Sequence, residues 1–194
     1  MAIANNALEP DLPARLPLAV ALWLPRGQAT AQSLVQDWLR ARGGDADLQR
    51  DAHGRPWLRD GSGDVSWSHC GDALLTAHGE GLRVGVDIER LRPRPRALDL
   101  ARRFFHPDSL RWLQRQPDVE AAFVRLWCAH EAVLKAHGKG LAFGLAKVAF
   151  ADAGGGQLRL LHCDAALGDA GAWSLHAFAP AAGLHAALAW RAAY

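Results

Sequence analysis

The segment from Val119 to His137 has the longest helical pattern in the chain. Apolar and aromatic side chains recur there every three or four residues, which places them on one stripe of a helix: Phe123, Leu126, Trp127, His130 and Leu134. Gly138 and Gly140 follow this segment and are expected to stop the helix. We therefore predict a helix over residues 119–137 that buries this stripe.

Two charged residues, Glu131 and Lys135, lie one turn apart at the edge of the stripe. They form either a surface ion pair, which would stabilise the helix slightly, or part of a groove beside Trp127. The pattern alone leaves both interpretations open. His130 lies inside the stripe, so we predict a packed, neutral imidazole; a phosphate-binding cation is the alternative.

A strand pattern covers residues 82–89, where apolar and polar side chains alternate. Val84, Val86 and Ile88 are expected to pack into the core, while Asp87 and Glu89 project together from the other face. Two converging carboxylates suit Mg²⁺, which prefers oxygen ligands. The alternative is a solvated strand end that carries two unrelated acids.

A hydroxyl and an imidazole, Ser68 and His69, end another predicted strand, residues 65–69. Such groups can bind phosphate oxygens, and a hydrogen-bonded turn is the alternative. A nucleophilic serine–histidine pair is not favoured, because neighbouring residues on a strand face opposite sides.

The remaining pattern predicts further strands and helices around a proline-rich link, residues 92–96. The predicted strands cover residues 18–24, 72–78, 173–178 and 184–190, and the predicted helices cover residues 30–42, 98–105 and 109–114. Turn-forming residues dominate positions 45–64. The segment Trp173-Ser174-Leu175-His176 echoes Trp67-Ser68-His69, through either duplication or chance.

Composition narrows the class of protein. The chain has 194 residues and a formal net charge of only +2. This charge does not favour binding of nucleic acid by a broad, positively charged surface. The three cysteines, Cys70, Cys128 and Cys163, have no CxxC spacing, so neither a disulfide framework nor a zinc site is expected from them. No apolar run has the length of a membrane span, and the start does not read as a signal peptide. A cytoplasmic protein is expected.

Four segments in order carry a family resemblance: VSWSHCGD, GVDIERL, RRFFHPDSL and LWCAHEAVLKAHGKGL. Over about residues 53–150 the chain resembles the phosphopantetheinyl transferase superfamily. Its hallmarks are a G-[IV]-D-x-E strand and, about 40 residues later, a W-x-x-K-E-x-x-x-K helix followed by GKG. Two separated motifs at the right spacing make this signal specific.

The resemblance implies an α+β fold of two similar α/β halves related by a pseudo-twofold axis, with coenzyme A in the cleft between them. The halves would be residues 1–96 and 97–194. The implied activity is Mg²⁺-dependent (Mn²⁺ is also possible) transfer of the 4′-phosphopantetheine group from coenzyme A to a serine of an acyl or peptidyl carrier protein. Such carriers serve fatty-acid, polyketide or nonribosomal-peptide synthesis. A monomer with no nucleic-acid or membrane partner is expected.

The resemblance also assigns roles to individual residues. Asp87, Glu89 and Glu131 match the metal ligands, and Glu131 is the candidate base or a metal ligand only. Lys135 matches the catalytic helix lysine near the pyrophosphate. The matches to coenzyme-binding positions are Arg55, Ser68, His69, Lys135 and Lys139.

The chain departs from the family pattern at three places. His130 stands where the family usually has lysine. The family's basic N-terminal arm is not evident, and only Arg40, Arg42 and Arg50 are nearby candidates. Residues 151–194 are assigned by position only. Two other functions therefore stay open: a degenerate member that binds coenzyme A or a carrier without turnover, and a different Mg²⁺-dependent phosphotransferase.

Overall fold

A computed structural model describes residues 7–44 and 46–193. The α-helices are α1 (Ala31–Ala41), α2 (Ala97–Phe104), α3 (Pro107–Gln114) and α4 (Val119–His137). The strands are β1 (Ala19–Trp23), β2 (Leu48–Arg50), β3 (Pro56–Leu58), β4 (Asp64–Cys70), β5 (Ala73–Gly79), β6 (Leu82–Arg90), β7 (Val148–Gly154), β8 (Gln157–Cys163), β9 (Ser174–Phe178) and β10 (Leu184–Ala192). Short 3-10 helices are η2 (Gly140–Phe143), η3 (Leu145–Lys147), η4 (Ala165–Leu167) and η5 (Ala170–Ala172).

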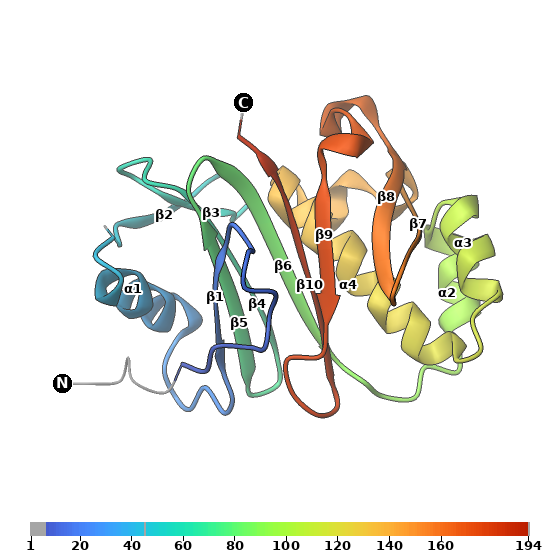
Figure 1. The fold of residues 1–194 in the computed structure, drawn as a ribbon, viewed down its shortest axis with the longest axis horizontal. Helices are drawn as coiled ribbons and strands as arrows, with labels where there is room; N and C mark the ends of the chain where they lie inside the picture. Colours follow the sequence, from blue (N-terminus) through green and yellow to red (C-terminus); the bar gives the residue numbers. More distant parts are fainter. Residues whose placement is uncertain (1–6, 45, 194) are drawn as a thin grey trace.

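Two antiparallel sheets of three strands each form the centre of the molecule (Figure 1). One has the order β1-β5-β4, and the other has the order β6-β10-β9. Two hairpins, β2-β3 and β7-β8, are separate two-stranded sheets. The mixed, antiparallel architecture confirms the α+β class.

Strand alternation divides the core into layers. Side chains from β1 and β5 meet side chains from β6 and β10 in a cluster between the two sheets that includes Leu22, Leu75, Val84, Val86, Ile88 and Leu188. The opposite face of the first sheet packs on α1 through Trp23, Leu34, Val35 and Leu74. The opposite face of β6 and β10 packs on α4. The core prediction for Val84, Val86 and Ile88 is therefore confirmed.

Side chains of β4 join the two sheets. The Asp64 carboxylate accepts a hydrogen bond from the Val84 N–H at 2.7 Å, and the Ser66 hydroxyl oxygen accepts one from the Val86 N–H at 3.2 Å. Because 64, 66 and 68 alternate along the strand, these polar side chains lie on one side of β4 and meet the backbone of β6. This contact fixes the register of β4 against β6.

Helix α4 has the predicted bounds but is buried more widely than predicted. It begins at the N-cap Asp118, whose side chain accepts from the Ala121 N–H, and it ends at Gly138, which has φ of +102°. Of the predicted stripe, Trp127 is only partly buried, whereas small side chains outside the stripe, such as Cys128 and Ala132, are buried. The reason is that α4 has partners on several sides: β6 and β10, then α2 and α3.

The predicted helices and central strands are present, with ends that differ from the predicted ones by at most two residues. Two hairpins were not predicted. Residues 45–64, expected to be turns, contain β2 and β3, and the segment after α4 contains β7 and β8. The similarity of the two halves and the boundary at residue 96 stay predictions; β6, before that boundary, pairs with β10 after it. None of the helices in residues 7–44 and 46–193 is both long and apolar enough to cross a bilayer.

Candidate functional site

The site forms where β6 crosses α4, and the crossing depends on Gly85. A Cβ atom at this position would lie 1.9 Å from the Ala132 carbonyl oxygen and 2.6 Å from the Ala136 backbone nitrogen. Only glycine permits so close an approach of strand and helix backbones. The side chains that follow on the same face of β6 are therefore held against the last turns of α4.

Asp87 is the next residue on that face, and its side chain is only 6% exposed. Its Oδ1 atom accepts a hydrogen bond from the Ser68 hydroxyl at 2.8 Å and from the Lys135 ammonium at 2.6 Å. Lys135 also donates to the Ser68 oxygen at 2.8 Å. Three predicted site residues, from β4, β6 and α4, thus form one buried polar cluster. The ion pair recorded for Lys135 crosses between elements and favours the groove interpretation.

The second carboxylate oxygen of Asp87, Oδ2, is buried and finds no hydrogen-bond partner among the described residues. A buried carboxylate oxygen without a donor is costly, because the charge has lost its water. A divalent cation would supply the missing contact. This orphaned oxygen fits the predicted Mg²⁺ site.

Glu89 and Glu131 add negative charge near Asp87. Burial raises the pKa of the Glu89 carboxyl, and the Asp87 charge raises it further. Burial also raises the pKa of the Glu131 carboxyl, which Lys135 lowers and Asp87 and Glu89 raise. The carboxylates therefore repel one another, as expected of a ligand set whose counter-ion is a metal.

The three carboxylates are not gathered around one position as the ligands of a bound ion would be. Within residues 7–44 and 46–193, the oxygens of Asp87, Glu89 and Glu131 are not gathered within 4.8 Å of one another. Lys135 occupies Asp87 Oδ1, and Arg94 contacts Glu89 Oε2 at 3.2 Å. The assignment of all three as ligands of one ion stays a prediction.

His130 is a core residue. Its ring is fully buried, stacks on Phe105 with centroids 4.3 Å apart, and meets Phe150 edge-on at 4.6 Å. Nδ1 donates to the Leu126 carbonyl at 2.8 Å, whereas Nε2 lies near Val148 without a well-aligned hydrogen bond. Burial lowers the pKa of His130 to about 4, so the ring is neutral at pH 7. The packed interpretation is confirmed.

Arg55 lies beside the cluster, largely occupied by internal contacts. Its guanidinium pairs with the Asp64 carboxylate and donates to the Lys135 carbonyl at 3.1 Å and the Pro56 carbonyl at 3.3 Å. These bonds tie the β2-β3 hairpin to α4 and β6. A contact from Arg55 to a coenzyme phosphate stays a prediction.

A basic hollow of about 190 Å³ opens next to this arginine. Its walls include Arg50, His53, Arg55 and Lys135, with Trp67 against the Arg50 guanidinium at 5.1 Å. Lys139 is exposed between two glycines that also line the hollow. His69 is exposed on the face of β4 opposite Ser68, because adjacent strand residues alternate. The structure therefore separates His69 from Ser68 rather than bringing them together.

Sequence patterns did not identify two further features of the site. Arg94, in the proline-rich link, pairs with Glu89 and donates its backbone N–H to the Glu120 carboxylate at 2.6 Å. An apolar hollow of about 380 Å³ begins at Glu89 and Arg94 and is lined by side chains that include Phe104, Phe123, Trp127 and Leu141. For Arg94, the one signal in the sequence is its position shortly after the Asp87–Glu89 motif.

Comparisons with known proteins identify the family of the chain. The family model described as "4′-phosphopantetheinyl transferase superfamily" matches residues 83–189, from β6 to β10. The chain is 31% identical over 122 residues to the 4′-phosphopantetheinyl transferase HetI of Nostoc sp., which covers 60% of this chain and 52% of the relative. It is 37% identical over 101 residues to the 4′-phosphopantetheinyl transferase psf-1 of Bacillus pumilus, which covers 50% of this chain and 42% of the relative.

The chain spans about half the length of the curated relatives it matches. A crystal structure of holo-[acyl-carrier-protein] synthase from Neisseria meningitidis aligns with a TM-score of 0.45 and 19% identity, covering 57% of this chain and 97% of that one. Because the family model matches more than half of the residues, the chain belongs to the 4′-phosphopantetheinyl transferase superfamily.

Proposed function

We propose that the protein transfers the 4′-phosphopantetheine group of coenzyme A to a serine of an acyl or peptidyl carrier protein, with Mg²⁺ as cofactor. The observation that carries this proposal is the buried Asp87, held by Ser68 and Lys135, with one oxygen unpartnered. Asp87, Glu89 and Glu131 would hold the ion. When bound, Mg²⁺ offsets the negative charge that develops on the pyrophosphate oxygens.

Two hollows flank this cluster in an order that suits coenzyme A. The basic hollow includes Lys135, and the apolar hollow begins at Glu89, two residues after Asp87. A molecule with its nucleotide phosphates in the first hollow and its pantetheine arm toward the second would carry its pyrophosphate across the carboxylates. The charges of Arg50, Arg55 and Lys135 favour that orientation.

In the proposed reaction, the carrier serine oxygen attacks the β-phosphorus of coenzyme A. The bond from that phosphorus to the bridging oxygen breaks, and adenosine 3′,5′-bisphosphate leaves. Glu131 accepts the serine proton, a role favoured by the raised pKa that burial gives its carboxyl. Lys135 stabilises the charge on the leaving phosphate. The remaining catalytic contribution is the positioning of the two substrates.

The carrier would dock beside the apolar hollow. Phe104 and Leu141 at its rim are 40% and 49% exposed, and Arg102 and Arg103 lie in the last turn of α2. Exposed apolar side chains next to arginines suit an acidic helix with an apolar face, the surface that family carriers are expected to present.

A fluorescent coenzyme A analogue and a panel of apo carrier proteins test the proposal. We expect Mg²⁺-dependent labelling of at least one carrier at its serine, none after chelation, and none with the Asp87→Ala variant. Far-UV circular dichroism checks that this variant folds. Tight coenzyme A binding without labelling of any carrier would instead support a degenerate member, which the neutral His130 at the usual lysine position favours. Nucleotide binding without coenzyme A binding would support a different phosphotransferase.

A further inference from the structure

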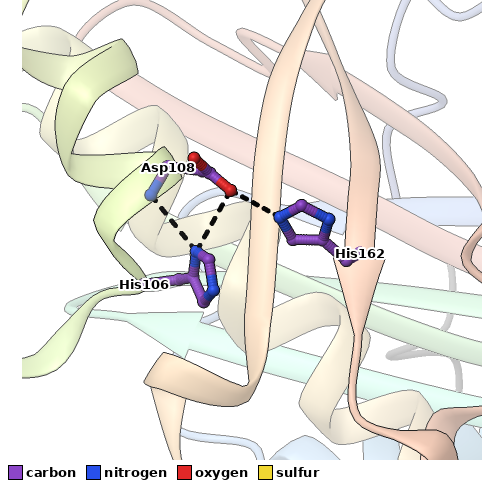
Figure 2. A group of neighbouring side chains, drawn as sticks. All are labelled: His106, Asp108 and His162. Atoms are coloured by element: carbon purple, nitrogen blue, oxygen red, sulfur yellow. Dashed lines mark hydrogen bonds and ion pairs between the residues drawn. The ribbon is translucent and has the colours of Figure 1, made fainter.

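Three side chains far from the carboxylate cluster converge at the start of α3. Figure 2 shows that His106 and Asp108 come from the beginning of this helix, while His162 reaches across from β8. One nitrogen of each imidazole and one carboxylate oxygen lie within 4.8 Å of one another. His162 Nε2 is 2.5 Å from Asp108 Oδ2, and His106 Nδ1 is 3.5 Å from the same oxygen.

The surrounding fold fixes these three residues relative to one another. His106 is the N-cap of α3 and Pro107 is its first residue, so the backbone that carries Asp108 is helical. The fully buried Ser109 accepts a hydrogen bond from the Phe150 N–H at 3.0 Å, which anchors α3 to the β7-β8 hairpin. Residues 54 positions apart are therefore held together by the core and not by the ion pair alone.

The three ligand atoms are held close together by hydrogen bonds that an ion would replace. His106 Nδ1 accepts the Asp108 N–H at 3.2 Å, so this nitrogen carries no proton. Arg111 pairs with the other oxygen of Asp108, Oδ1, and leaves Oδ2 facing the imidazoles. An outer cation on a ligating carboxylate is a common way to orient it.

We propose that His106, Asp108 and His162 form a binding site for a divalent transition-metal ion of the zinc type. Two imidazoles and one carboxylate suit zinc, cobalt or nickel ions, whereas Mg²⁺ requires oxygen ligands. The site is thus chemically distinct from the Asp87 cluster. When an ion binds, bonds to the ion replace two interactions. One is the long hydrogen bond from the Asp108 backbone N–H to His106, and the other is the contact between His162 and Asp108.

The fourth position of a tetrahedral ion is left to water. The cluster borders an open hollow of about 540 Å³ that also touches Lys147, Cys163 and Asp164. The Cys163 thiol donates to the Gly168 carbonyl at 3.3 Å and lies outside the cluster of ligand atoms. Three protein ligands beside an open hollow are typical of a site with an exchangeable water.

Bound metal would cross-link α3 to β8, two elements joined through the packing of α3 on β7. Because an ion that binds only the folded chain stabilises it by mass action, the site predicts a metal-dependent melting temperature. The alternative is a metal-free helix cap with a surface histidine–aspartate pair, and it predicts no such dependence.

Titration of the full chain with Co²⁺, followed by its visible absorption, tests the proposal. Tetrahedral Co²⁺ absorbs strongly, so the probe reports coordination as well as binding. We expect one tight equivalent that survives millimolar Mg²⁺ and the Asp87→Asn substitution. His162→Ala should weaken that binding about tenfold or more, because it removes a ligand. His162 is exposed, so this variant should fold, and Asp108→Asn tests the same loss with the side-chain shape retained.

The matched control is His176→Gln, because His176 lies on β9 against Phe178 and outside the cluster. Its Co²⁺ binding and the metal-induced rise in melting temperature should equal those of the wild type. Equal Co²⁺ spectra and affinities in the wild type, His162→Ala and Asp108→Asn would overturn the proposal. Loss of the tight equivalent in Asp87→Asn alone would also overturn it, by placing the ion at the carboxylate cluster.

Discussion

Lowering the pH should destabilise the protein through protonation of His130. The burial of the imidazole sets the size of this effect. Burial lowers the pKa of this imidazole from 6.5 to about 4, which corresponds to about 3 kcal/mol of preference for the neutral ring. The unfolded chain, in which the ring is hydrated, binds the proton first as the pH falls. The stabilisation is therefore complete above pH 6.5 and is lost progressively as the pH falls toward 4.

Replacement of His130 by leucine should remove this part of the pH dependence. Leucine keeps apolar contact with Phe105 and Phe150 and loses only the hydrogen bond to Leu126, whose carbonyl is an intrahelical acceptor in any case. From pH 7 to pH 5, the free energy of unfolding should fall by about 2 kcal/mol more in the wild type than in His130→Leu. Coenzyme A affinity should be almost unchanged.

Urea unfolding followed by far-UV circular dichroism at both pH values measures the difference. The other titrating groups contribute equally to the pH dependence of unfolding in the variant and the wild type, so their contributions cancel in the comparison. His185, whose pKa burial also lowers to about 4, is one of these groups. The exposed His53 offers a control, because His53→Leu should keep the full wild-type loss. Equal losses in the wild type and His130→Leu, or a large loss of coenzyme A affinity in the variant, would refute the argument for a neutral core imidazole.

Three further substitutions test the carboxylate site. Asp87→Asn should weaken Mg²⁺ binding about tenfold or more and lower turnover, as followed in a magnesium titration; unchanged magnesium dependence would remove Asp87 from the ligand set. Lys135→Ala should lower turnover about 100-fold at saturating coenzyme A and carrier, whereas near-normal turnover would remove Lys135 from the active site. Gly85→Ala should destabilise the fold by about 3 kcal/mol or more in urea, and the control Gly44→Ala, whose added Cβ would meet nothing closer than 3.4 Å, should cost far less.

The elements that carry the site could be predicted because their patterns are strong. Residues 82–89 alternate over several positions, and residues 119–137 keep a helical stripe between a capping aspartate and a glycine. Their period also predicted the burial of Val84, Val86 and Ile88 and of most of the helical stripe. The two missed hairpins have weak patterns: β2 and β3 have three residues each, and β7 contains alanine, aspartate and glycine in place of β-branched residues.

Pairings between distant residues could not be predicted, because no local pattern encodes them. Lys135 could bond to Glu131, one turn away, or to any acid that the fold brings near; the structure selects Asp87. The family resemblance matched Arg55 to a coenzyme-binding position, but no local pattern predicted that its guanidinium is held by Asp64 and by backbone carbonyls. The split of His69 from Ser68 was implicit in strand alternation, but the family resemblance grouped the two residues.

The geometry of the site follows from one backbone contact. Gly85 brings β6 onto α4 at Ala132 and Ala136, and Asp87 and Lys135 lie within two residues of that contact on their own elements. Any side chain at position 85 would push the two elements apart and lengthen the 2.6 Å separation between the ammonium and the carboxylate. Because the interaction of charges depends on their distance, a residue with no functional group sets the electrostatics of the cluster. Glycine at position 85 is therefore a positioning residue of the proposed reaction as well as a packing requirement of the fold.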